Sequence, residues 1–122
     1  MARLKLKLQL YCSDAIAMGP GKADLLEAIA RTGSISAAGR ALGMSYRRAW
    51  LLVDTMNRCF KQPLVETHPG GGKSAGAKLT AEGEAALAAY QALSARVQQG
   101  APGAAFDALE AAIRQSPLPS QS

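Results

Sequence analysis

The sequence predicts a mainly α-helical domain with a small β component. Apolar residues make up 48% of the chain and lean on alanine and leucine, which favour helices, whereas aromatic residues contribute only 5%. Apolar side chains recur at helical spacing in several windows that glycine or proline interrupts. A glycine run at 70–72 lies between two short segments of strand type. A chain of 122 residues is long enough for one compact domain.

The first predicted elements are a strand and a helix. From residue 4 to residue 10, leucine alternates with lysine and glutamine, and this period of two predicts a half-buried strand. Residues 11–21 are predicted to be irregular because glycine and proline interrupt the pattern there. A helix is predicted for residues 22–32, and Gly33 follows it where a left-handed glycine commonly ends a helix.

Two helices joined by a glycine are predicted next. Ser36 is the expected N-cap of a short helix over 37–42, and Gly43 is its expected left-handed terminator. Ser45 is a second expected N-cap and opens a longer helix. That helix has one apolar stripe at helical spacing, made of Ala49, Val53, Met56 and Phe60. Trp50 borders this stripe and is predicted to be a core residue that anchors it.

A hairpin and two further helices are predicted after Pro63. The hairpin has a strand at 64–67, a glycine-rich loop and a return strand at 78–79. The helices are a long one that Thr80 caps and that runs to about Val97, and a short one over 104–114. Residues 116–122 are rich in serine, proline and glutamine and are expected to fray. One domain over residues 1–115 with a short tail is therefore expected.

This order of elements is that of a winged helix-turn-helix domain. The small residues Ala38 and Gly43 are expected to let the two helices of the motif pack closely. The long helix has an apolar stripe, and the alanines within it permit the close approach of a second helix. The stripe consists of Leu87, Tyr90, Leu93 and Val97. One winged domain offers too little surface to cover this stripe, so a homodimer built on the long C-terminal helix is predicted.

The positive charge of the chain is concentrated in its centre. From residue 40 to residue 78 there are seven lysines and arginines against two acidic residues, an excess that equals the whole net charge of +5. Such a segment between neutral flanks is typical of nucleic-acid-binding proteins, although a solvated basic face without a partner has the same composition. Double-stranded DNA is the expected partner.

The helix that opens at Ser45 is predicted to place its first turn in the major groove of DNA. Arg47 and Arg48 on this turn are expected to contact guanine edges or phosphates. The glycine-rich loop is expected to be a wing on the DNA backbone and not a P-loop, because Thr67 stands where that motif requires glycine. The predicted DNA-binding residues are Ser34, Ser36, Ser45, Tyr46, Arg47, Arg48, Lys73, Ser74 and Lys78.

Other classes of function find little support. The only histidine, His68, lies beside proline and glycines, so we predict no catalytic site, no metal, no cofactor and no enzymatic activity. Cys12 and Cys59 lack metal-ligand spacing and are expected to be reduced, buried thiols. No segment approaches the roughly 20 apolar residues of a membrane span, and the N-terminus lacks the continuous apolar run of a signal peptide. A cytoplasmic protein without a membrane partner is expected.

The segment SISAAGRALGMSYRRAW, with the following DTMN, strongly resembles the N-terminal domain of the ModE family, the molybdate-responsive transcriptional regulators. The similarity extends to LKLKLQL, TGSIS, GGGKSAG, KLTAEGEAAL and the AAI of the last helix, from about residue 4 to residue 115. A generic LysR-type domain shares only parts of this pattern. The resemblance implies a LysR-like winged-helix dimer that binds palindromic operators, often those of molybdate-transport and molybdoenzyme genes.

Full-length members of that family carry C-terminal molybdate-binding domains, and this chain ends where they would begin. It is therefore expected to be a single-domain member or the DNA-binding part of a longer protein, without a molybdate site of its own. The predicted function is sequence-specific transcriptional regulation. The alternative is an interaction module that dimerises with a full-length relative and modulates it without its own operator. Such a relative, or a separate molybdate-binding protein, is a further candidate partner.

Overall fold

The computed structural model describes residues 2–68 and 76–120. The helices of this part are α1 (Pro20–Thr32), α2 (Ile35–Ala41), α3 (Tyr46–Cys59), α4 (Ala81–Gly100) and α5 (Ala104–Ala112). Its strands are β1 (Leu10–Cys12), β2 (Ala15–Met18), β3 (Val65–His68) and β4 (Gly76–Leu79). They form two antiparallel hairpins, β1–β2 and β3–β4. The predicted mainly helical fold with a small β component is confirmed.

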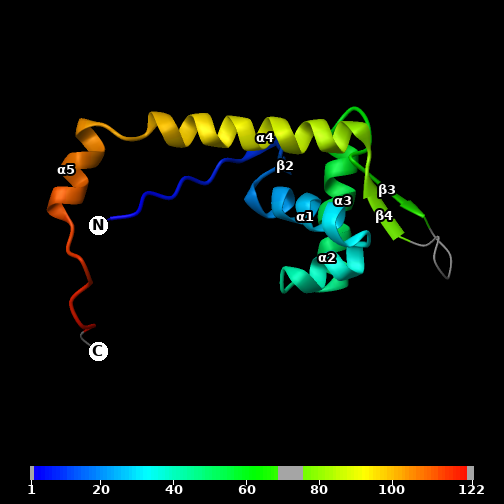
Figure 1. Ribbon diagram of the computed structural model, residues 1–122, viewed down its shortest axis with the longest axis horizontal. Coiled ribbons are helices and arrows are strands. Elements are labelled where there is room, and N and C mark those ends of the chain that lie inside the picture. The colour runs from blue at the N-terminus through cyan, green and yellow to red at the C-terminus, as the bar shows by residue number, and fades with distance from the viewer. Residues whose placement is uncertain (1, 69–75, 121–122) are drawn as a thin grey trace.

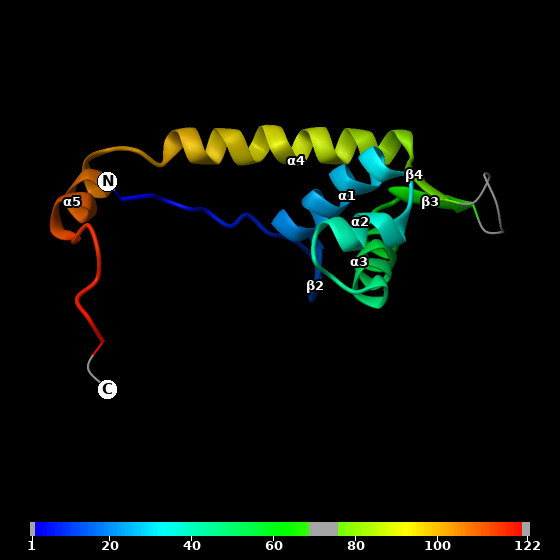
Figure 2. The same cartoon turned by 60° about the horizontal axis from the view of Figure 1, so that its bottom comes forward.

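The described chain divides into a compact head and a projecting arm (Figure 1). The head comprises the described residues between 10 and 90, which contain α1, α2, α3, both hairpins and the first half of α4. The arm comprises residues 2–9 and 91–120, with the end of α4 and all of α5. In both views the arm extends to one side of the head, and the N-terminal segment runs beside α4 (Figure 2).

One apolar core lies between the helices of the head. It is built mainly on one face of α1, where Leu25, Leu26 and Ile29 are fully buried. One face of α3 packs against it. The buried residues of that face are the predicted stripe of Ala49, Val53 and Met56, with Phe60 partly buried at its end.

The β3–β4 hairpin, which is the predicted wing, is attached to the head on both strands. The Asn57 side chain of α3 accepts hydrogen bonds from the Leu64 and Val65 amides (2.9 and 3.2 Å) and donates one to the Val65 carbonyl (3.0 Å). On the returning strand, the Ala77 amide donates to the Gly33 carbonyl at the end of α1 (2.9 Å). The base of the wing therefore has a defined position relative to α1 and α3.

Four of the predicted helix ends are confirmed. Gly33 and Gly43 have φ angles of 78° and 71°, in the left-handed region that favours glycine. The hydroxyls of Ser45 and Thr80 accept hydrogen bonds from the amides three residues later, at 3.1 and 3.0 Å. These signals act over a few neighbouring residues, which is why they can be recognised in the sequence.

The N-cap predicted at Ser36 is wrong. Helix α2 begins at Ile35, and the Ser34 hydroxyl caps it by accepting a hydrogen bond from the Ala37 amide (2.8 Å). Both serines suit an N-cap by residue type. The side chain of Ile35 is buried in the core, so the helix begins early enough to place it there, and Ser34 becomes the cap.

The strand predicted from residue 4 to residue 10 is wrong, as is the irregular stretch predicted after it. A strand needs a neighbouring strand for its backbone hydrogen bonds. In the described chain no strand pairs with residues 4–9, whereas β1 and β2 pair with each other further on. The N-terminal segment follows α4 instead, and the Tyr90 hydroxyl donates a hydrogen bond to the Leu8 carbonyl (2.8 Å).

The apolar stripe predicted on α4 is divided between the head and the arm. Leu87 and Tyr90 are partly buried against the core, whereas Leu93 and Val97 are 51% and 38% exposed. Gly83 in the first turn is buried, and a Cβ at this position would overlap the Leu64 carbonyl oxygen. Only glycine allows α4 to leave the wing at this close approach.

The prediction of two buried thiols is wrong for Cys12. This cysteine is exposed in β1, whose three residues all lie at the surface, and Cys59 at the end of α3 is partly buried. Burial and a hydrogen bond with the Cys12 thiol raise the pKa of Cys59. Within the described residues, no helix is both long and apolar enough to cross a membrane, and no three His, Cys, Asp or Glu residues are grouped to hold a metal ion.

Candidate nucleic-acid interface

The helix-turn-helix consists of α2, a turn at 42–45 and α3. Gly39 of α2 permits the close approach of the two helices, because a Cβ there would lie 3.2 Å from the Ala49 Cβ and 3.3 Å from the Met44 carbonyl oxygen. Ala38 is fully buried, as its size predicts. Gly43 has open space around it and contributes through its positive φ, so Gly39 and not Gly43 is the residue of close contact.

The N-terminal turn of α3 is exposed and carries positive charge. Ser45 caps the helix, and the side chains of Tyr46, Arg47 and Arg48 are exposed. The first amides of a helix lack intrahelical acceptors, and the helix dipole adds partial positive charge at this end. Phosphate groups bind such ends for both reasons. This turn contains no acidic residue that would oppose an anion.

Arg47 and Arg48 lie on different sides of α3, because consecutive residues are rotated by about 100° around a helix. Arg47 lines a shallow surface hollow together with Trp50. Burial lowers the pKa of Lys22 at the start of α1, the Cys59 sulfur opposes this, and the charge of Arg48 lowers the pKa further. The first turn of α3 therefore presents an exposed arginine on each of two sides.

Trp50 is not a core residue, so the prediction made for it is wrong. Its side chain is 46% exposed, although the preceding Ala49 is fully buried. The rotation of about 100° per residue turns Trp50 away from the core and onto the side of Tyr46, four residues earlier. Leu51 is 43% exposed and lines the same hollow. The outward face of α3 thus combines aromatic, aliphatic and cationic side chains.

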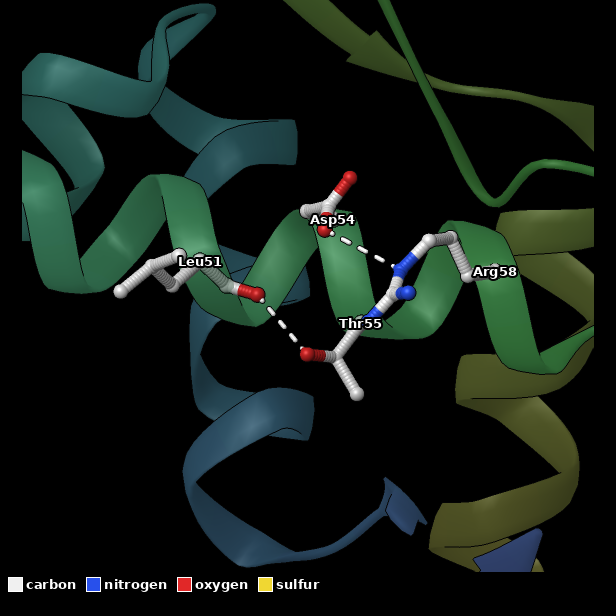
Figure 3. Close-up of polar contacts among 4 residues, drawn as sticks. All are labelled: Leu51, Asp54, Thr55 and Arg58. Carbon is white, nitrogen blue, oxygen red and sulfur yellow. Dashed lines mark hydrogen bonds and ion pairs between the residues drawn. The ribbon is translucent and has the colours of Figure 1, made fainter.

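The following turns of α3 contain a balanced pair of charges (Figure 3). The Asp54 carboxylate forms an ion pair with the Arg58 guanidinium (Oδ2 to Nε, 3.2 Å). Beside it, the Thr55 hydroxyl donates a hydrogen bond to the Leu51 carbonyl (3.0 Å). Because the charges of Asp54 and Arg58 cancel, the positive charge of α3 is concentrated in its first turn.

Ser34 and Ser36, both predicted to bind DNA, lie at the start of α2 and already accept hydrogen bonds. Ser34 caps the helix, and the Ser36 hydroxyl accepts from the Arg40 guanidinium (2.9 Å). A hydroxyl that accepts a hydrogen bond retains its own hydrogen for donation. Either serine can therefore still donate to a phosphate oxygen.

The described part of the wing contributes Lys78 to the predicted site. Lys78 lies opposite Glu66 in the β3–β4 register, and the two exposed side chains form an ion pair (Nζ to Oε1, 3.3 Å). An exposed pair of this kind contributes little, so a phosphate can compete for the lysine. His68 is exposed at the end of β3, and the predicted residues Lys73 and Ser74 lie outside the described residues.

A family model for bacterial regulatory helix-turn-helix proteins of the lysR family matches residues 22–84. The chain belongs to this family. Its fold is also similar to the solved "CbnR_DBD-DNA complex", with a TM-score of 0.53 and 21% sequence identity, covering 77% of this chain and 97% of that one. The family model and the likeness of fold confirm the winged helix-turn-helix.

Three relatives confirm the resemblance to the ModE family. The molybdenum-pterin-binding protein MopA of Rhodobacter capsulatus is 41% identical over 106 residues, 87% of this chain and 38% of MopA. MopB of the same organism is 50% identical over 80 residues, 66% of this chain and 30% of MopB. The DNA-binding transcriptional dual regulator ModE of Escherichia coli (strain K12) is 37% identical over 106 residues, 87% of this chain and 36% of ModE. The chain therefore spans about a third of the length of these relatives.

The first turn of α3 was predicted to bind DNA from the sequence, whereas the rest of its outward face was not. The missed residues are Trp50 and Leu51. Each follows a predicted DNA-binding residue by four positions, since Trp50 follows Tyr46 and Leu51 follows Arg47, and this spacing places both pairs on one side of a helix. The large apolar side chains favoured a core position instead, because such residues are more often buried.

Proposed function

We propose that this chain is a sequence-specific DNA-binding transcriptional regulator. The observation that carries the proposal is the exposed, capped and cationic first turn of α3, and the wing adds a further exposed lysine. The printed name of the ModE relative, a transcriptional dual regulator, supports the same role. An interaction module without an operator of its own does not require this cationic turn. A regulator of bacterial DNA works in the cytoplasm and needs no catalytic site.

We assign distinct roles to the residues of the interface. The amides of the first turn of α3, with Ser45, approach a phosphate. Arg47 extends from the outward face towards base edges in the major groove, and Arg48 contacts a flanking phosphate. The wing, through Lys78, Lys73 and Ser74, contacts the adjacent backbone.

A homodimer is part of the proposal. Leu93 and Val97 expose apolar surface on the arm, and Leu93 also lines an apolar groove with Leu8, Phe60 and Tyr90. A second copy related by a two-fold axis can cover both surfaces. Such a dimer places its two recognition helices about 34 Å apart, which matches successive major grooves of a palindromic operator. Given the names of the relatives, genes connected with molybdenum are the operators to test first.

Two single substitutions test the assignment of the arginines. On a duplex selected from a random library by the wild-type protein, Arg47→Ala should lower affinity by about 1–3 kcal/mol and relax the preference for the bases that it contacts. Arg48→Ala should weaken binding to all sequences alike and reduce the salt dependence by about one phosphate contact. Fluorescence anisotropy titrations at several salt concentrations measure both effects.

Arg114→Ala, which removes an exposed arginine of the arm, is the matched control and should leave both curves unchanged. If the Arg47→Ala/Arg48→Ala double variant binds like the wild type, α3 is not the recognition helix. If the wild-type protein selects no sequence from the library, the proposed function is wrong.

A further inference from the structure

The hollow on the outward face of α3 is apolar in the middle of a cationic region. It is lined by Tyr46, Arg47, Trp50 and Leu51, and the two aromatic side chains are 58% and 46% exposed. Trp50 is the only tryptophan of the chain. The core does not include Trp50, since the buried face of α3 consists of other residues. Tyr46, Trp50 and Leu51 are exposed side by side, and a contiguous apolar patch of this kind marks a binding surface.

The arm is not that partner. Phe60, just after the end of α3, lines the groove beside Tyr90 and Leu93 of α4. Trp50 lies ten residues earlier, which corresponds to about 15 Å along a helix axis. The groove of α4 and the hollow around Trp50 are therefore separate surfaces, and a second copy centred on the groove is centred away from the hollow.

The surroundings of the hollow indicate the chemistry of its partner. The capped first turn of α3 and Arg47 favour phosphates and base edges, so DNA is the molecule that reaches this surface. In the major groove, the apolar group that a base edge presents is the 5-methyl group of thymine. Trp50 lies one helical turn behind Tyr46 on the side that would face the groove floor.

We propose that Trp50 is a specificity-determining residue that packs against the 5-methyl group of a thymine in the operator half-site, with Tyr46 and Leu51 completing the apolar contact. This inference rests on the proposed DNA-binding function and deepens it. The contact gives the protein a preference for thymine at a defined position, in addition to the hydrogen bonds that Arg47 makes.

The decisive experiment changes the DNA and leaves the protein intact. In a duplex selected by the wild-type protein, each thymine of one half-site is replaced in turn by uracil, which differs only by the missing methyl group. At one position or two adjacent positions the affinity should fall about fourfold, the effect of removing one buried methyl group. With Trp50→Ala, the thymine and uracil duplexes should bind equally at that position.

Two controls separate this contact from general damage to the interface. Arg47→Ala should weaken binding to both duplexes but retain the ratio between thymine and uracil. The Trp50→Ala variant should unfold at the wild-type temperature, because the side chain lies outside the core. The emission of Trp50, the single tryptophan, gives an independent readout: the operator should protect it from acrylamide quenching.

The outcomes distinguish the two proposals. Tight, sequence-selective binding that is insensitive to uracil at every position overturns the role of Trp50 and leaves the DNA-binding function standing. Unchanged acrylamide quenching of Trp50 in the DNA-bound state also overturns it. Absence of any selected sequence overturns both proposals.

Discussion

The head and the arm differ in how much of their leucine side chains they bury. In the head, Leu25 and Leu26 of α1 are fully buried, whereas in the arm Leu93 and Leu109 are 51% and 72% exposed. The head therefore buries its apolar surface within its own chain, and the arm leaves much of its apolar surface open. This difference suits the head to fold on its own core and the arm to bind a partner. The two proposed interfaces are also separate. The first turn of α3 lies at the opposite end of that helix from Phe60, which lines the groove of α4.

Polar substitutions on the arm test most directly whether its exposed apolar residues form a dimer interface. With Leu93→Asp and Val97→Asp in both protomers, four half-exposed apolar side chains are lost at about 1 kcal/mol each, which weakens dimerisation roughly a thousandfold. The head should remain folded. Light scattering should report the 12.7 kDa chain for the variant and twice that mass for the wild type. Leu93→Ile and Val97→Ile are the matched control, and a wild-type protein that is monomeric while binding a palindrome tightly would contradict the dimer.

A matched pair of leucine substitutions compares how much a leucine contributes to stability in the head and in the arm. Leu26→Ala should destabilise the protein by about 2–5 kcal/mol, because it leaves a cavity in the core of the head. Leu109→Ala in α5 removes a side chain that is mostly exposed, and its effect on the isolated chain should stay within about 0.5 kcal/mol. Urea unfolding at low protein concentration measures both values. Equal losses for the two variants would show that the arm shares the core of the head.

Gly83→Ala tests the close approach between the first turn of α4 and the start of the wing. A Cβ there would overlap the Leu64 carbonyl oxygen, so Gly83→Ala should move α4 or the wing and cost about 1–3 kcal/mol. Gly100→Ala at the end of the same helix is the control, because it has open space around it. Thermal unfolding of the two variants compares them. A Gly83→Ala variant as stable as Gly100→Ala would show that α4 leaves the wing less closely than the structure has it.

The smallest expected effect concerns the ion pair between Asp54 and Arg58. Both side chains are partly or largely exposed, so Asp54→Asn should change stability by less than about 1 kcal/mol. It should nevertheless raise affinity for non-specific DNA slightly, because Arg58 loses its negative partner on the outward face of α3. Titrations with random duplex DNA at low salt check this. Weaker binding by the variant would mean that Asp54 itself contacts the bases.

Local signals in the sequence predicted the framework of the fold. The glycines at 33 and 43, the caps at Ser45 and Thr80 and the stripe of α3 depend on neighbouring residues within one or two helical turns. The wing follows from two short strands around a glycine run. The concentration of cations led to the prediction that the first turn of α3 faces DNA, and that turn is exposed. Each of these features can be recognised without knowing what lies opposite in space.

The wrong predictions share one physical cause. In each case a contact with residues distant in the sequence determined the local structure or the burial. The leucine alternation at 4–10 gave no strand, because the segment lies along α4 and bonds to the Tyr90 hydroxyl. The burial of Ile35 selected Ser34 over Ser36 as the cap. Leu87 and Tyr90 share a stripe with Leu93 and Val97, yet only the first two meet the core.

The sequence by itself determined the helices, the hairpin of the wing, the turn glycines and the cationic first turn of α3, since propensity, periodicity and charge are local properties. Only the tertiary structure decided that Trp50 lies at the surface. A tryptophan beside an apolar stripe fits either side of a helix until the packing of α1 and α2 defines which face of α3 is covered. That packing buries Ala49 and leaves Trp50 pointing outwards, because adjacent residues of a helix are rotated by about 100°.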